Sequence, residues 1–166
     1  YELLDKLLYM LPEKNREHDK PFLMFIDRIY NVPGVGTVVS GTVKQGRIRA
    51  GSKLLLGPDA SGEFREVTAR SIEMHYCPLE EANAGLVVGI AIRGVKHEEV
   101  ERGMILCDKS LDPKAVRSFE AEVLVLNHPT RIATGYEPVF HGYTVAEVVK
   151  VECIDKPYLK AGESGR

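Results

Sequence analysis

The feature that most constrains this fold is a series of short apolar, β-branched segments that begins after Pro21 and is punctuated throughout by glycine and proline. Segments of this length and composition favour β-strands, and the punctuation favours turns between them. The expected strands are residues 22–30, 36–43, 53–57, 65–76, 85–94, 119–126 and 144–152. Short strands separated by regular turn signals are typical of a barrel or a sandwich, so the sequence predicts an all-β body.

A different pattern occupies the N-terminus. Leucines recur there at i, i+3 and i+4 spacing: Leu3, Leu4, Leu7, Leu8 and Leu11. This spacing predicts a short helix with one apolar stripe, which Pro12 ends, followed by a polar linker over residues 13–20. No other segment has a convincing helical period, which argues against a wound α/β sheet.

The predicted strands fall into two groups. The loop at residues 110–116, which contains Asp112-Pro113, separates them, so we expect a helix and linker over 1–18, a first barrel over 19–112 and a second unit over 113–166. The second unit is small for a barrel, and we expect it to be truncated. Truncation leaves unpaired strand edges, which need a partner.

Composition limits the classes of function. The 166 residues include 22 basic and 24 acidic side chains, a net charge of -2, so any nucleic-acid contact must be local. Three cysteines without a C-x-x-C motif argue against a disulfide framework or a zinc knuckle and favour a reducing, cytoplasmic setting. No apolar run approaches the length of a membrane span, so no membrane partner is expected. Since the chain does not begin with methionine, we expect a fragment of a longer protein.

Motifs for catalysis, nucleotides and metals are weak. The glycine-rich stretch 32–41 has Thr42 where a phosphate loop needs lysine, and it continues as strand, so it predicts a hairpin turn with positive φ at glycine. His75 and Cys77 lie two apart on a predicted strand, but two ligands do not make a metal site. No G-x-S-x-G nucleophile motif occurs. We therefore expect no catalytic, cofactor-binding or metal-binding residues in this segment.

One constellation suits RNA. It joins residues 71–76, residues 85–94 and the basic side chains Arg93, Lys96, His97 and Arg102. Cations bind phosphates, a carboxylate accepts a hydrogen bond from a ribose hydroxyl, and an apolar pocket receives an unstacked base. On residue types alone, a charged loop on a barrel rim is the simpler interpretation.

Five blocks then show a family resemblance. They are residues 19–24 (DKPFLM), 36–41 (GTVVSG), 72–75 (IEMH), 89–96 (GIAIRGVK) and 99–103 (EVERG). In order and spacing they resemble the second domain, and the start of the third, of translational GTPases of the elongation factor Tu / elongation factor 1-alpha superfamily. Residues 32–37, 54–59 and 119–126 resemble the GTP-binding protein 1/2 branch most.

The resemblance implies a Greek-key-type translation-factor barrel of the domain 2 type, followed by a truncated barrel of the domain 3 type. It implies binding of the acceptor end of aminoacyl-tRNA, coupled to the GTP state of a G domain that lies outside this chain. GTP and Mg²⁺ would bind in that G domain, and this segment would do no chemistry. The ribosome and the protein's own G domain are the other implied partners, in the cytoplasm.

The resemblance also assigns roles to individual residues. Glu73 matches the family carboxylate beside the terminal adenosine, and the backbone around His75 and Tyr76 matches the place of the esterified amino acid. Arg102 matches an arginine that meets the 5′ phosphate. The positions that match the pocket for the base are Asp27, Val32, Val38 and Ala91.

Several of these side chains depart from the family pattern. Asp27 is one methylene shorter than the usual glutamate, Val32 and Ala91 are smaller than the usual isoleucine and leucine, and Tyr76 replaces a frequent basic residue. We therefore expect a looser pocket or a different nucleotide end. The alternative function is a protein-interaction module that docks the ribosome or an RNA-decay complex, and a self-sufficient enzyme ranks last.

Overall fold

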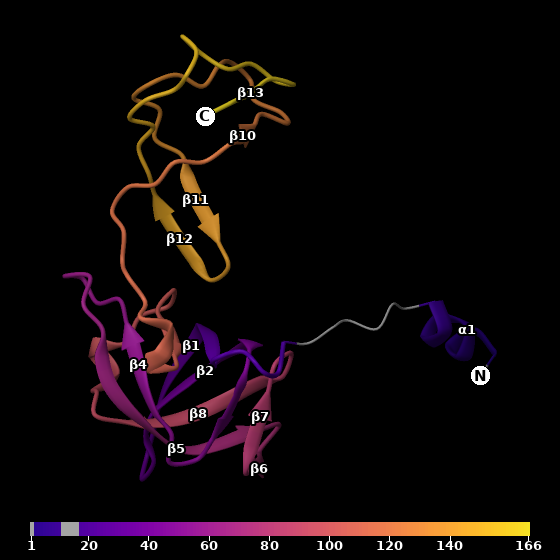
Figure 1. Ribbon diagram of the computed structural model, residues 1–166, viewed down its shortest axis with the longest axis vertical. Helices are drawn as coiled ribbons and strands as arrows, with labels where there is room; N and C mark the ends of the chain where they lie inside the picture. Colours follow the sequence, from indigo (N-terminus) through magenta and orange to yellow (C-terminus); the bar gives the residue numbers. More distant parts are fainter. Residues whose placement is uncertain (1, 11–16) are drawn as a thin grey trace.

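The computed structural model describes residues 2–10 and 17–166, and this part of the chain is mostly β-strand with one short α-helix (Figure 1). The helix, α1, spans Glu2–Met10, as the leucine spacing predicts, and its Leu3, Leu4, Leu7 and Leu8 side chains are exposed. Leu11, Pro12 and residues 13–16 of the predicted linker lie outside the described residues. No helix in residues 2–10 or 17–166 has the length and apolarity needed to cross a membrane.

A closed barrel forms the first body. Its strands are β1 (Leu23–Val32), β2 (Gly36–Gln45), β4 (Lys53–Gly57), β5 (Arg65–Met74), β8 (Val87–Arg93) and β9 (Ile105–Cys107). They pair in the order β4-β9-β1-β2-β8-β5, and antiparallel pairing of β4 with β5 closes the ring. This closure confirms the predicted all-β barrel and removes the free sheet edges that an open sheet would present.

The core lies inside this ring because apolar residues alternate along the strands. Met24, Ile26, Val39, Ile90 and Leu106 are all completely buried. Their neighbours in sequence point outward, so the external surface of the barrel carries the side chains available to a ligand.

Short elements complete the barrel. They are β3 (Arg47–Arg49), β6 (Cys77–Leu79), β7 (Glu81–Asn83) and the 3₁₀ turns η1 (His97–Glu99) and η2 (Lys109–Leu111). β3 pairs with β7, and β6 pairs antiparallel with the end of β5. Three-residue strands carry too little alternation to stand out in a sequence, which is why β3, β6, β7 and β9 were not predicted.

The glycine-rich stretch forms the β1–β2 hairpin. Gly34 and Gly36 have φ values of 77° and 101°, and the Val35 amide donates to the Val32 carbonyl at 3.0 Å. This confirms the predicted hairpin turn, because such backbone angles suit glycine.

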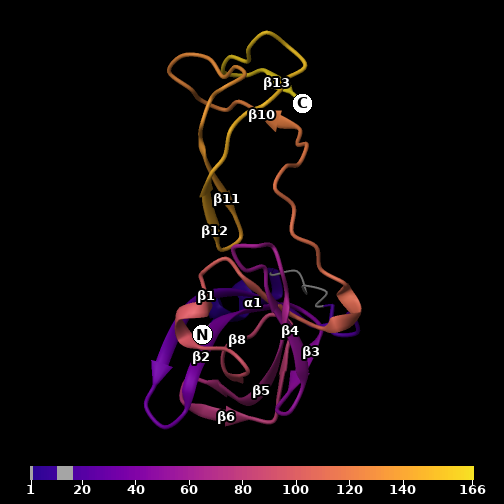
Figure 2. The same cartoon turned by 90° about the vertical axis from the view of Figure 1, so that its left-hand side faces the viewer.

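The chain beyond η2 forms a second, smaller body of paired strands (Figures 1 and 2). Its strands are β10 (Val123–Leu124), β11 (Val139–Gly142), β12 (Val145–Val148) and β13 (Ser164–Gly165). β10 pairs with β13 and β11 with β12, and within the described residues these pairs do not close into a ring. The fold is therefore a closed barrel followed by an incomplete one, as predicted.

The predicted strands of this second body were too long. Residues 119–126 contribute only β10, and residues 144–152 contribute only β12. Phe119, Leu126 and Val148 are exposed, whereas Val125 and Leu159 are buried. A strand needs neighbours to satisfy its backbone groups and its apolar face, and few neighbours are present here.

Candidate nucleic-acid interface

Two cross-strand rows lie on the outside of the sheet formed by β1, β2, β8 and β5. One row joins Tyr30, Val38, Ala91 and Ser71, and the adjacent row joins Arg28, Ser40, Gly89 and Glu73. We call these eight residues the outer face. Since directly opposite residues of neighbouring strands have Cβ atoms about 4.5–5.5 Å apart, successive members of each row lie side by side.

The outer face lacks a side chain at Gly89, between Ser40 and Glu73, and we call this position the recess. A Cβ placed on this residue would lie 3.6 Å from Val38 Cγ1 and 4.0 Å from the carbonyl oxygen of Glu73. A methyl group at this position would thus make ordinary van der Waals contact with an apolar side chain and with strand β5. A glycine within a strand often marks the close approach of a ligand, and that signal was present in the sequence but was not assigned to the site.

The side chains around this recess are partly apolar and partly charged. Ala91 is only 4% exposed although it points outward, Val38 is half-buried, and Glu73 is exposed. Tyr30, which is 44% exposed, adds an aromatic edge that sequence reasoning missed. The predicted Val38, Ala91 and Glu73 therefore come together, with an apolar floor and a carboxylate beside it.

Val32 lies on the same strand as Tyr30, two residues further along, where β1 enters its hairpin. It pairs with Gly36 and is half-buried. Because side chains two apart on a strand share a face, Val32 borders the outer face at its hairpin end.

His75 and Tyr76 form the turn between β5 and β6, not the end of a strand as the sequence predicted. Met74 and Cys77 close this two-residue loop, and both loop residues have positive φ, 51° and 65°. His75 and Cys77 therefore do not share a strand face. Tyr76 is 98% exposed, and the turn follows Glu73 directly.

Positive φ at both positions of a two-residue hairpin loop strongly favours Asn-Gly. A side chain in the left-handed region costs roughly 1–2 kcal/mol per residue. We expect Tyr76→Gly to raise the free energy of unfolding by about 1 kcal/mol in urea denaturation, with Tyr143→Phe, which keeps the backbone unchanged, as the neutral control. A loss of stability in Tyr76→Gly would show that the exposed ring makes contacts that outweigh the backbone strain.

Asp27 and Arg102 lie beside the outer face, on the β9 side of β1. Asp27 sits at a register shift between Ile26 and Arg28, and its Oδ1 lies 3.1 Å from Arg102 Nη2. Arg28 Nε lies 4.0 Å from the other carboxylate oxygen. Asp27 therefore joins a charge cluster with two arginines, and Arg28 connects that cluster to the row that contains Glu73.

Comparison with known proteins identifies this architecture. The sequence model of elongation factor Tu domain 2 matches residues 36–107, from β2 to β9. GTP-binding protein 1 of Xenopus laevis is 35% identical over 163 residues, which cover 98% of this chain and 25% of that protein. Elongation factor 1-alpha of Pyrococcus furiosus is 37% identical over 154 residues, which cover 90% of this chain and 36% of that protein.

This chain belongs to the elongation factor Tu / elongation factor 1-alpha superfamily of translational GTPases. A further member, elongation factor 1-alpha of Thermoplasma volcanium, is 36% identical over 170 aligned residues, which cover 93% of this chain and 38% of that protein. The chain thus spans between about a quarter and two fifths of the length of these relatives.

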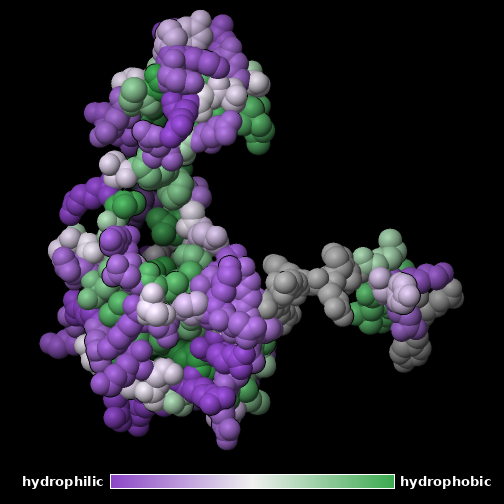
Figure 3. Space-filling view, viewed as in Figure 1, coloured by the Kyte–Doolittle hydropathy of each residue, from purple (hydrophilic) through white to green (hydrophobic). Residues whose placement is uncertain are grey.

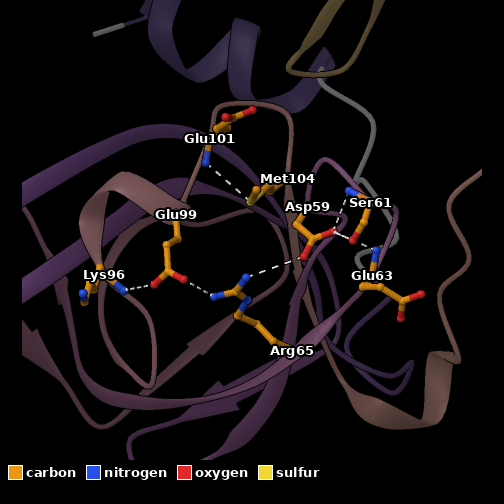
Figure 4. A network of polar contacts seen from close by, with 8 residues as sticks. All are labelled: Asp59, Ser61, Glu63, Arg65, Lys96, Glu99, Glu101 and Met104. Atoms are coloured by element: carbon orange, nitrogen blue, oxygen red, sulfur yellow. Dashed lines mark hydrogen bonds and ion pairs between the residues drawn. The ribbon is translucent and has the colours of Figure 1, made fainter.

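In this member of the superfamily, a polar network fixes the loop that leads to Arg102 (Figure 4). Arg65 Nη1 lies 2.6 Å from Glu99 Oε1, and Arg65 Nη2 lies 3.6 Å from Asp59 Oδ2. The other Glu99 oxygen accepts from the Lys96 amide at 2.8 Å. The start of β5 is thereby tied both to the β4–β5 loop and to η1.

Hydrogen bonds and charge pairs in this network favour the ionised forms of Asp59, Glu99 and Arg65. The Ser61 hydroxyl and then the Glu63 amide lower the pKa of Asp59 to about 2. The Lys96 amide and then Arg65 lower the pKa of Glu99, while Glu99 and then Asp59 raise the pKa of Arg65. The loop is therefore held by charged groups throughout the neutral pH range.

Within residues 2–10 and 17–166, no three His, Cys, Asp or Glu side chains gather closely enough to hold a metal ion. The chemistry that the outer face offers is recognition: an apolar recess, an exposed carboxylate and flanking guanidinium groups.

Proposed function

We propose that the outer face binds the unpaired acceptor end of an aminoacyl-tRNA and couples this binding to the GTP state of a G domain elsewhere in the protein. The observation that carries the proposal is the recess at Gly89, which lies between apolar Val38 and Ala91 and the exposed Glu73. Unpaired nucleotides are recognised by such combinations, in which a base packs on apolar or aromatic groups and a polar group binds the sugar.

Each assigned residue then has a physical role. The terminal base packs over Val38 and Ala91, with Val32 at the border, while Glu73 accepts a hydrogen bond from a ribose hydroxyl. The esterified amino acid lies at the His75–Tyr76 turn. Arg102 binds the 5′ phosphate, and Asp27 orients its guanidinium through their 3.1 Å ion pair.

The organisation of the whole protein follows from the same proposal. Residues 1–18 connect to a G domain that holds GTP and Mg²⁺, residues 19–112 form the tRNA-binding barrel, and residues 113–166 belong to the next barrel. The relatives named GTP-binding protein 1 and elongation factor 1-alpha support this organisation. Catalysis lies outside this segment, the ribosome is a further partner, and the protein works in the cytoplasm.

One observation favours a second candidate, a module that docks the ribosome or an RNA-decay complex. Asp27 is already paired with Arg102 and lies near Arg28, so neither partner of the ion pair needs a nucleotide for charge balance. In this case aminoacylation would have no influence on binding.

A titration of the whole GTP-bound protein with charged and deacylated tRNA separates the two candidates. We expect charged tRNA to bind more tightly and Glu73→Ala to cost about 1–3 kcal/mol, roughly 5- to 150-fold in affinity. Arg102→Ala is expected to weaken the dependence of tRNA affinity on salt concentration, by the amount that corresponds to the loss of about one phosphate contact.

Glu147→Ala provides a matched control, because Glu147 is an exposed glutamate on β12, away from the outer face. Unchanged affinity in both Glu73→Ala and Arg102→Ala would refute the tRNA-binding proposal. Equal affinity for charged and deacylated tRNA would favour the docking module.

A further inference from the structure

Part of the second body contacts the β1–β2 ribbon at Phe25 and Lys44, at the end of the ribbon opposite its hairpin turn. The loop between β11 and β12 reaches the barrel there, as both ribbon views show (Figures 1 and 2). The Tyr143 ring stacks on Phe25 with centroids 4.1 Å apart and planes inclined by 9°. Lys44 Nζ lies 5.5 Å from the centroid of the same ring, so β1 and β2 both contact it.

The same loop reaches the segment that carries Arg102. A Cβ on Gly103 would lie 3.3 Å from Val145 Cγ2 and 3.5 Å from Val145 Cα, which means that β12 packs directly against this glycine. The Gly103 amide in turn donates to the Ile26 carbonyl at 3.1 Å, and the Ile26 amide donates to the Met104 carbonyl at 2.9 Å. The hairpin tip thus contacts the residue next to Arg102 and the strand that carries Asp27.

The tip adopts an unfavourable local conformation in this position. Gly142 and Val145 pair to close a two-residue loop, and Tyr143 has a φ of 52°, where glycine is strongly preferred. The Thr144 hydroxyl is buried without a hydrogen-bond partner among the described residues. Both features cost free energy, and such outliers persist only where surrounding contacts compensate for them.

Apolar residues gather at the narrow waist between the two bodies (Figure 3). The contacts that compensate for the strained tip therefore lie between the bodies rather than within the hairpin. A hairpin selected for its own stability would carry glycine at position 143, whereas only a side chain there can stack on Phe25.

We propose that the β11–β12 tip is a latch: Tyr143 holds the second body against β1 and β2, and Val145 holds the loop of residues 101–104 so that Arg102 stays in place beside Asp27. Tyr143 is thus a positioning residue for the arginine, and its influence on RNA rests on the proposed function above. The latch connects a contact between the two bodies at Phe25 and Lys44 with ligand binding at the outer face.

Two native thiols allow a test without engineered labelling sites. Cys77 lies in the barrel and Cys153 in the second body, and both are exposed, whereas Cys107 is buried. Burial raises the pKa of Cys107 to about 11, so this thiol stays protonated and unreactive at neutral pH. Spin labels on Cys77 and Cys153 therefore report the arrangement of the two bodies through their distance distribution.

We expect a single narrow distribution in the 166-residue chain and in Tyr143→Phe, which keeps the stacking ring. Tyr143→Ala and Tyr143→Gly should broaden it, even though glycine relieves the backbone strain. Hydrogen exchange at the Gly103 and Met104 amides should become faster in the same two variants. Narrow distributions and unchanged exchange in Tyr143→Ala would overturn the latch.

RNA binding provides a second, separate test of the latch. In the whole protein, Tyr143→Ala should weaken tRNA binding several-fold, and this loss should disappear when Arg102 is already alanine, while Tyr143→Phe binds like the wild type. An equal loss with and without Arg102 would overturn the positioning role. If the wild type binds no tRNA, the proposed function fails, and the distance and exchange measurements still decide whether the latch exists.

Discussion

Replacing Gly89 with valine is expected to abolish most tRNA affinity while leaving the barrel folded. The valine side chain would fill the recess between Val38 and Glu73, where even a Cβ already reaches contact distance at 3.6 Å. Packing of one unstacked base contributes about 1–3 kcal/mol, so we expect affinity to fall roughly 5- to 150-fold. The measurement is a titration of the whole GTP-bound protein with charged tRNA.

Gly89→Ala is the matched control. A single methyl fits against Val38 without a clash, so this variant should keep its stability and lose less affinity than Gly89→Val. Gly89 does not have positive φ, so the backbone at this position accepts a side chain. Valine is favoured in β-strands, and the substitution is therefore compatible with the fold. Full affinity in a folded Gly89→Val protein would exclude the recess as the binding place.

Gly41→Ala, in contrast, is expected to destabilise the barrel severely. A Cβ on Gly41 would lie 2.0 Å from the carbonyl oxygen of Phe25, which is backbone and has no rotamer by which to move away. Gly41 is buried and pairs with Ile26 beside the register shift in β1. Overpacking of a well-filled interior costs about 1–3 kcal/mol and occasionally more, and we expect a loss of about 3 kcal/mol or above.

Denaturant unfolding of Gly41→Ala and Gly89→Ala side by side tests this expectation. Both are strand glycines without positive φ, so they differ mainly in the space that the methyl group meets. Gly89→Ala should change the free energy of unfolding by less than about 1 kcal/mol. Similar stability in the two variants would mean that β1 shifts to accept the extra methyl group.

These two glycines lie on neighbouring strands, β2 and β8, and serve different purposes. Inside the barrel, Gly41 allows β1 and β2 to approach closely, and outside it, Gly89 leaves the recess. At the end of β1 and β2 opposite their hairpin turn, Phe25 and Lys44 contact Tyr143. A ligand at the recess and the second body therefore both contact strand β2, and Asp27 and Arg28 lie on the adjacent strand β1.

In the incomplete second body, sequence patterns predict the extent of the strands poorly. Residues 119–126 have the composition of a strand, but only Val123–Leu124 form one, and Val125 continues the backbone hydrogen bonding to Gly162 and Glu163. A strand forms where a neighbour accepts its hydrogen bonds. His75 and Tyr76 likewise continue the apolar pattern of β5, yet they turn, because β6 pairs back onto β5. Local composition specifies a tendency, and the partner decides the outcome.

By itself, the sequence determined the all-β class, the leading helix, the β1–β2 turn and the family, because alternation, leucine spacing and glycine placement are local properties that survive without coordinates. It also named Val38, Ala91 and Glu73, which the register brings together on one face. Only the tertiary structure decided that Asp27 pairs with Arg102, that Gly89 forms a recess and that Tyr143 stacks on Phe25. Those features join residues from distant parts of the chain, and the closure of the barrel and the seating of the hairpin tip set their distances.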